Sequence, residues 1–228
     1  PPEILAYRPP GSRPNTPGWT LRVVPNKFPA LRIEGELDRA GVGLYDKMNG
    51  VGAHEVIIES PNHDDSPSTI PEERVKDILW SFKERSLDLK KDRRFRSILI
   101  FKNQGEAAGA SLEHSHSQLI ALPIVPRELA MELDGSQFYH KYRERCIFCD
   151  ILRQEIEQEE RVIISTGDFM AIAPFASRFP FETWILPREH LSFYEEITGG
   201  MAENLAKLFH DLLRRMDKVL DSPPYNFY

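Results

Sequence analysis

The chain has 228 residues, of which 41% are hydrophobic and 28% are charged, and its formal net charge is −6. This length allows one large or two small domains with a sizeable core. The acidic balance, with no compensating basic stripe, argues against a nucleic-acid partner. No stretch approaches the ~18 apolar residues of a membrane span, so we expect no membrane partner. The chain opens on Pro1-Pro2-Glu3 with no leader sequence, which indicates a start inside a longer protein.

The first predicted strand and helix lie in the first half of the chain. Residues 54–63 combine a β-prone apolar centre with a proline and a final histidine, which predicts a strand with His63 at its exit. Thr69 and Glu72 resemble a capping box, with Pro71 in the first turn of a helix. The apolar face of this helix repeats at helical spacing and consists of Val75, Ile78, Leu79 and Phe82.

The most informative pattern follows the next predicted strand, residues 97–101. Small residues at 109–111 lead into the sequence His-Ser-His-Ser-Gln at 114–118. Because side chains alternate along an extended segment, His114 and His116 share one face. One imidazole can then act as a nucleophile while the other binds a metal or fixes the local geometry. The alternative is a surface loop with two incidental histidines.

The only two cysteines, Cys146 and Cys149, form a C-x-x-C pair in the polar, Glu-rich segment 125–160. Such a pair is either redox-active or half of a zinc site. A redox pair normally follows a strand and opens a helix, whereas this pair follows a polar segment, which favours zinc with two further ligands. Either chemistry fits a reducing compartment, so we expect a cytoplasmic protein.

A weak internal repeat organises the chain. Residues 181–190 resemble residues 54–63, with a glutamate in second place and a histidine in last place in both. A second amphipathic helix follows, with an apolar stripe of Leu205, Leu208, Phe209, Leu212, Met216 and Val219. In the first unit a strand and the two histidines follow the helix, whereas the second unit stops at Tyr228. The repeat therefore predicts further residues beyond Tyr228, including a metal-binding histidine.

Several motifs in the same order resemble one family. The sequence at 114–118 is similar to the His-Pro-His-x-Gln signature of galactose-1-phosphate uridylyltransferases, a branch of the histidine-triad superfamily. Residues 26–31, 101–105 and 180–183 match further family segments, so the resemblance covers nearly the whole chain. It implies an α+β fold of two tandem histidine-triad-like units, each an antiparallel half-barrel packed by helices, assembled as a homodimer.

The repeat and the resemblance together predict the domain organisation. We expect an N-terminal unit at 1–124 that carries the two histidines. A connecting segment at 125–160 carries the cysteine pair, and a C-terminal unit spans 161–228.

The resemblance also implies an activity. Family enzymes move UMP from UDP-glucose to galactose-1-phosphate through a uridylyl-histidine intermediate, and His116 corresponds to the nucleophile. A neutral imidazole suits this chemistry near pH 7, provided that its other nitrogen is held as a donor, for which we expect a backbone carbonyl. Ser115 stands where the family usually has a proline, which would fix the local backbone. The positions that correspond to substrate contacts are Asn26, Lys27, Asn103, Gly109, Ala110, Ser111 and Gln118.

Two structural zinc sites follow from the same resemblance. His63 and His114 match two ligands of the first site, whose cysteine pair would lie upstream of His63. Cys146, Cys149 and His190 match three ligands of a second site found in one branch of the family. The fourth ligand of that site, a histidine, would lie beyond Tyr228, where the repeat also predicts one.

Two other functions stay open. The two-zinc branch includes nucleotide-sugar phosphorylases, for example on ADP-glucose, in which inorganic phosphate discharges the intermediate on the same histidine. A non-catalytic nucleotide-binding or metal-stabilised protein is less favoured, because His116, Ser111 and Gln118 are all present.

Overall fold

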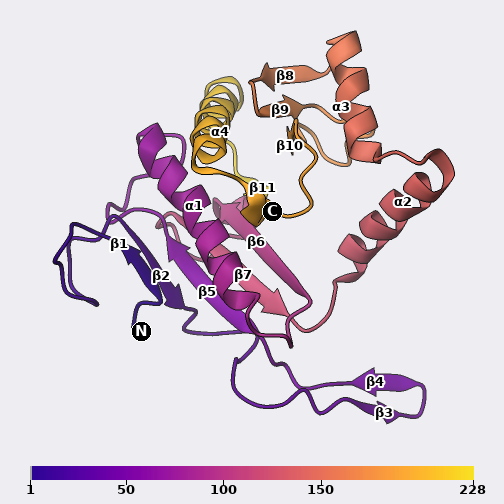
Figure 1. Cartoon of the computed structure of the whole chain (residues 1–228). Coiled ribbons are helices and arrows are strands. Elements are labelled where there is room, and N and C mark those ends of the chain that lie inside the picture. Colours follow the sequence, from indigo (N-terminus) through magenta and orange to yellow (C-terminus); the bar gives the residue numbers. More distant parts are fainter. Residues whose placement is uncertain (1) are drawn as a thin grey trace.

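The computed structural model describes residues 2–228 (Figure 1). Its main sheet has six strands in the order β1-β2-β5-β7-β6-β11, with every neighbouring pair antiparallel. The strands are β1 (Leu5–Tyr7), β2 (Leu21–Pro25), β5 (Ala53–Ile58), β6 (Ser97–Gln104), β7 (His116–Leu122) and β11 (Tyr225–Phe227). Helices α1 (Glu72–Leu89) and α4 (Gly199–Leu220) pack together and cover one face of this sheet (Figure 1). This arrangement confirms the α+β class.

Alternation along the strands separates the two faces of the sheet. In β5, the buried Ala53, Glu55 and Ile57 point to the helices, and the residues between them are half-buried on the open face. The same alternation runs along β7. The predicted helix stripes fill the core from the helix side, although Val219 is 74% exposed because the stripe of α4 ends before its last turn.

The predicted capping box is wrong. Helix α1 begins at Glu72 with Pro71 as its N-cap residue, and no side chain caps it. Thr69 instead folds back on Ser66, accepting from its backbone N–H at 2.9 Å and donating to its carbonyl at 3.1 Å. A proline between the turn and the helix supplies the φ value of a helix entry, so the threonine hydroxyl is used locally.

A second, smaller sheet has the order β10-β9-β8 and is built from β8 (Val162–Ser165), β9 (Phe169–Ile172) and β10 (Trp184–Pro187). Both strands predicted from the internal repeat are present, as β5 and β10. Helix α3 (Ile147–Gln158) packs on this sheet through Leu152, Met170 and Ile172. The connecting segment is largely helical, since it consists mainly of α2 (Arg127–Arg143) and α3. Helix α2 has no buried residue of its own.

The C-terminal strand returns to the first sheet. Strand β11 pairs with β6, with Asn226 opposite Asn103 and Phe227 opposite Lys102. Figure 1 shows β11 beside β6, although most of the second half of the chain lies between these two strands in sequence. The two expected units therefore share one sheet, and their boundaries at residues 124 and 160 stay predictions.

The remaining elements are peripheral. A hairpin of β3 (Ala40–Val42) and β4 (Tyr45–Lys47) projects from the body of the protein (Figure 1). Single 3₁₀ turns occupy Glu106–Ala108 and Tyr194–Glu196. Over residues 2–228, no helix combines the length and the apolar character that crossing a membrane requires.

A buried ion pair joins α1 to the sheet. The Nε and Nη2 atoms of Arg85 donate to the two carboxylate oxygens of Glu55 at 2.7 and 2.8 Å. Both side chains are buried, so neither charge has water as an alternative partner. The pair fixes the rotation of α1 relative to β5.

Arg85→Met should lower the free energy of unfolding by about 3–5 kcal/mol, because it leaves the Glu55 carboxylate buried without a counter-charge. Urea denaturation measures the loss. The double variant Glu55→Leu/Arg85→Met should recover most of it, since an apolar pair of similar volume is often as stable as a buried ion pair. A single variant as stable as the double would contradict this account.

Candidate functional site

His116 is the first residue of β7 and lies opposite Ile58 of β5. Its side chain is only 8% exposed, and its Nδ1 lies 2.8 Å from the carbonyl oxygen of His114. A carbonyl only accepts, so this contact places the ring proton on Nδ1 and leaves a lone pair on Nε2. The expected carbonyl acceptor is thus that of the other histidine of the motif.

A buried charge network lies on the opposite face of the same segment. The ammonium of Lys102 donates to a Glu59 oxygen at 2.8 Å, to the Ser115 hydroxyl at 3.0 Å and to the His116 carbonyl at 3.1 Å. The hydroxyls of Ser115 and Ser117 each donate to Glu59 at 2.5 Å. Lys102 and Glu59 are each 1% exposed, so all three ammonium protons and both carboxylate oxygens have partners away from water.

Gln118 lies two residues beyond His116 and therefore on the same open face. Its Oε1 is 2.9 Å from Nε2 of His54, a residue that the sequence reasoning did not select. His54 also contacts the segment that carries Asn26, with Nε2 3.0 Å from the Asn26 amide nitrogen. One imidazole thus brings together two predicted substrate-contacting residues from strands far apart in sequence.

The small-residue loop is held by the C-terminal strand. The Asn226 side chain donates to the Asn103 amide oxygen at 2.7 Å and to the Ala108 carbonyl at 2.9 Å. Asn103 in turn donates to the carbonyl of Gly109, whose φ of +85° ends the 3₁₀ turn. Glycine tolerates this left-handed backbone, which lets the chain turn back toward β7 with Ala110 as its next residue.

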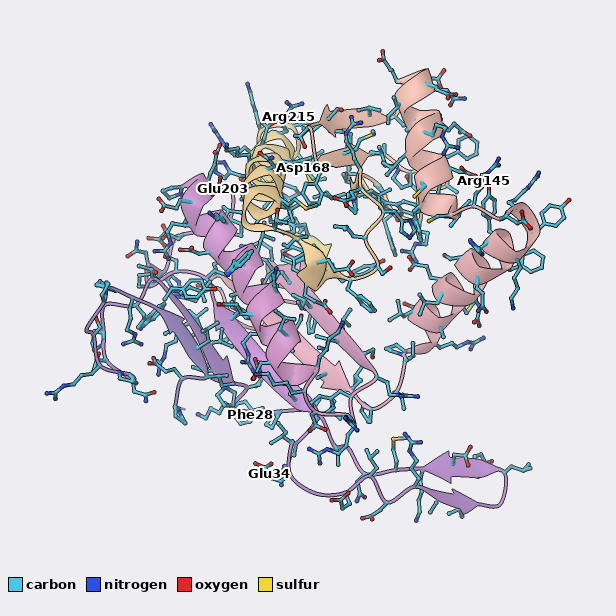
Figure 2. The ribbon with its side chains drawn as sticks, viewed as in Figure 1. Phe28, Glu34, Arg145, Asp168, Glu203 and Arg215 are labelled. Atoms are coloured by element: carbon cyan, nitrogen blue, oxygen red, sulfur yellow. The ribbon has the colours of Figure 1, made fainter. Side chains whose placement is uncertain are left out.

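Two predicted contacts stand apart from this group. Lys27 and Ser111 are exposed, and neither forms a hydrogen bond to another predicted site residue in the part of the chain that the structure describes. The Lys27 ammonium lies over the Phe28 ring, 5.4 Å from its centroid. Phe28, labelled in Figure 2, is itself 81% exposed. The structure therefore gives these two side chains no fixed place in the site.

His63 and His114 lie together, with ring centroids 5.5 Å apart. The Nε2 of His114 donates to the Ser60 carbonyl at 2.7 Å, which leaves Nδ1 with a lone pair. Such a backbone contact is typical of metal-binding histidines. The Glu113 carboxylate lies 3.5 Å from Nε2 of His63. Among residues 2–228, however, no third histidine, cysteine or carboxylate lies close enough to both histidines to complete a group of three ligands.

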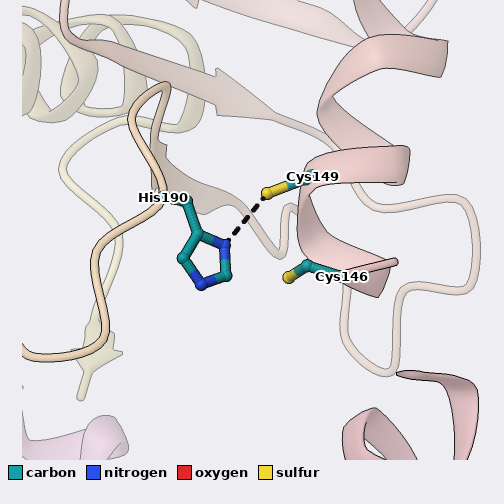
Figure 3. Close-up of side chains that lie close together, drawn as sticks. All are labelled: Cys146, Cys149 and His190. Atoms are coloured by element: carbon teal, nitrogen blue, oxygen red, sulfur yellow. Dashed lines mark hydrogen bonds between the residues drawn. The ribbon is translucent and has the colours of Figure 1, made fainter. Parts of the chain in front are cut away.

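Cys146, Cys149 and His190 form a compact group in which all ligand atoms lie within 4.8 Å of one another (Figure 3). Cys149 Sγ is 3.2 Å from His190 Nδ1. Cys146 is the N-cap residue of α3 and Cys149 lies in its first turn, while His190 follows β10. Two thiols and an imidazole are a ligand set that suits a tetrahedral metal, above all zinc.

The cysteine pair opens helix α3, but it follows helix α2 and not a strand, so it lacks the strand-to-helix setting of a redox pair. His190, whose Nδ1 lies 3.2 Å from Cys149 Sγ, supplies a third ligand atom that a redox pair does not need, which favours the metal-binding interpretation.

Two family models match the chain. The galactose-1-phosphate uridyl transferase N-terminal domain matches residues 19–126, and the C-terminal domain of the same family matches residues 132–226. The chain belongs to the galactose-1-phosphate uridyl transferase family. The predicted resemblance is thereby confirmed.

Relatives within this family carry two different activities in their names. The chain is 37% identical over 213 residues to ADP-glucose phosphorylase of Arabidopsis thaliana, covering 92% of this chain and 59% of the relative. It is 28% identical over 209 residues to galactose-1-phosphate uridylyltransferase of Thermotoga maritima, covering 91% and 65%. The chain thus spans less than two thirds of the length of these curated relatives.

Solved structures of the galactose-1-phosphate uridyl transferase family share the fold. The crystal structure of Arabidopsis thaliana ADP-glucose phosphorylase with bound ADP-glucose matches with a TM-score of 0.85 and 36% identity, covering 99% of this chain and 68% of that one. A uridylyltransferase structure matches with a TM-score of 0.84 and 29% identity, covering 96% and 72%.

Ser115→Ala removes a hydroxyl that accepts from Lys102 and donates to Glu59. We expect the free energy of unfolding to fall by about 1–3 kcal/mol, because a buried ammonium proton loses its acceptor. Ser117→Ala should cost a similar amount through the loss of one bond to the carboxylate. Urea denaturation compares both with Ser12→Ala, an exposed control expected within about 0.5 kcal/mol of the wild type. If Ser115→Ala behaved like the control, the network would not hold this segment.

Proposed function

We propose that this protein transfers a nucleotidyl group from a nucleoside diphosphate sugar through a covalent adduct on Nε2 of His116. The observation that carries the proposal is the contact between His116 Nδ1 and the His114 carbonyl at 2.8 Å. It holds the imidazole in one tautomer and one orientation, with the reactive lone pair on the other nitrogen. An imidazole prepared in this way can act as a nucleophile near neutral pH without a separate base.

The proposed reaction has two displacements at phosphorus. In the first, the Nε2 lone pair forms a bond to the α-phosphorus, and the bond from phosphorus to the bridging oxygen breaks, so the sugar 1-phosphate leaves with that electron pair. In the second, an acceptor phosphate oxygen attacks phosphorus, and the P–N bond returns its electrons to Nε2. Throughout, Nδ1 keeps its proton, and the His114 carbonyl stabilises the positive charge that the ring acquires.

Two donor and acceptor pairs are candidates. ADP-glucose with inorganic phosphate is supported by the 37% identity to a protein named ADP-glucose phosphorylase. UDP-glucose with galactose-1-phosphate, the pair that the family resemblance implies, is supported by the 28% identity to a galactose-1-phosphate uridylyltransferase. The two alignments cover nearly the same share of this chain, so their identities can be compared directly. Because the identity to the ADP-glucose phosphorylase is the higher of the two, we propose ADP-glucose as the first donor to test. The homodimer implied by the resemblance stays a prediction.

The adduct is directly measurable by intact mass. Mixing the protein with ADP-glucose or UDP-glucose in the absence of an acceptor should add one AMP or one UMP, and peptide mapping should place it on His116. His116→Ala should abolish the adduct, while His140→Ala, an exposed histidine on α2, should leave it unchanged. An adduct that persists in His116→Ala would disprove the assignment of the nucleophile.

We also propose that Cys146, Cys149 and His190 hold a structural Zn²⁺. Chelation should then lower the melting temperature, because a ligand set that exists only in the folded state couples metal affinity to folding. Cys149→Ser should lower both the zinc content, measured by elemental analysis, and the melting temperature. His140→Ala is the matched control for each measurement. Complete removal of zinc with an unchanged melting temperature would contradict a structural metal.

A further inference from the structure

His54 connects two parts of the site that the proposed chemistry uses separately. It lies on β5, on the open face of the sheet. Its Nδ1 is 3.1 Å from the backbone nitrogen of Ala30, and its Nε2 is 2.9 Å from Oε1 of Gln118. Its own carbonyl accepts from the Asn26 backbone N–H at 2.8 Å. The imidazole therefore bridges the segment 26–30 and strand β7.

The Ala30 contact determines the tautomer of His54. A backbone N–H can only donate, so Nδ1 must supply a lone pair and the ring proton must lie on Nε2. Nε2 then donates to Gln118. The third neighbour, the Asn26 amide nitrogen, is a donor because the Asn26 oxygen already accepts from the Phe28 N–H. The Nε2–H form thus makes two hydrogen bonds and leaves one donor-to-donor contact, with Asn26. The Nδ1–H form would make one hydrogen bond, with Asn26, and would set two donors against each other at Ala30.

The tautomer in turn determines which way the Gln118 amide faces. If the amide were reversed, its NH₂ would meet the Nε2–H of His54, donor against donor. With the oxygen held by His54, both protons of the amide nitrogen stay available, and no group in residues 2–228 accepts a hydrogen bond from them. A glutamine held in this way presents two donors on the face that carries Nε2 of His116.

We infer that His54 is a positioning residue that aims the Gln118 amide protons at the phosphoryl oxygens of the nucleotide. The inference rests on the proposed function, since it assigns these protons to the group transferred to His116. Donors that are already oriented stabilise the charge that develops on phosphoryl oxygens without reorganising in the transition state. Without His54, the amide would rotate freely and present oxygen as often as nitrogen.

Two substitutions separate the functions of the two ring nitrogens. Glutamine can place an amide N–H near the position of Nε2, and asparagine can place an amide oxygen near the position of Nδ1. His54→Asn should therefore keep the contact with the Ala30 N–H and lose the hydrogen bond to Gln118 Oε1. We expect the single-turnover rate of adduct formation to fall about ten- to hundred-fold. His54→Gln should recover most of that rate, and the dissociation constant for ADP or UDP should change less than about three-fold in either variant.

A measurement independent of turnover tests the same geometry. In the two-bond ¹H–¹⁵N spectrum of the wild type, the His54 signals, identified by their loss in His54→Gln, should show a neutral ring protonated on Nε2. A ring protonated on Nδ1, or equal rates for His54→Asn and the wild type, would overturn the inference. If the wild type forms no adduct with either nucleotide sugar, the proposed function fails, and the tautomer still decides whether His54 orients Gln118.

Discussion

The site depends on the buried ammonium of Lys102. This group joins three strands, because Lys102 lies on β6, its partner Glu59 directly follows β5, and Ser115 directly precedes β7. Leaving one of these charges unpaired in the interior would cost several kcal/mol. The segment before β7 therefore cannot move away from β5 and β6 without a large penalty, and the same ammonium holds the carbonyl of His116.

The network works because charged and reactive groups lie on opposite faces of one segment. Ser115 and Ser117 point to the helix side and bind Glu59, while His116 and Gln118 alternate with them on the open side. Rigidity is thus supplied from the core, while the imidazole that we propose as the nucleophile lies on the open face with 8% of the residue exposed. A serine between the histidines fixes the backbone through side-chain hydrogen bonds, where a proline would fix it through its ring.

The sequence was sufficient for the features that depend on local pattern. Period-two and helical spacing predicted β5, β10 and the core faces of α1 and α4, and the motif predicted His116. Residues that act through long-range pairing were missed, because Glu59 and His54 meet their partners only when β5 aligns with β7 and β6. A lysine interrupting an apolar strand was the one available signal for Lys102. Helix α2 buries no side chain and so offers no apolar stripe from which its bounds could be predicted.

The second half of the chain supports the site, although the proposed nucleophile lies in the first half. Strand β11 completes the first sheet, its Asn226 orients Asn103, and burial followed by the charge of Glu59 raises the pKa of Tyr225. These contacts place β11 against both the small-residue loop and the buried network. The Cys146–Cys149–His190 group ties α3 to the chain that leads from β10 into α4, and α4 leads directly into β11. A metal held there would therefore affect the site through the placement of this last strand. We expect such a metal to change the stability of the fold and to take no direct part in the reaction.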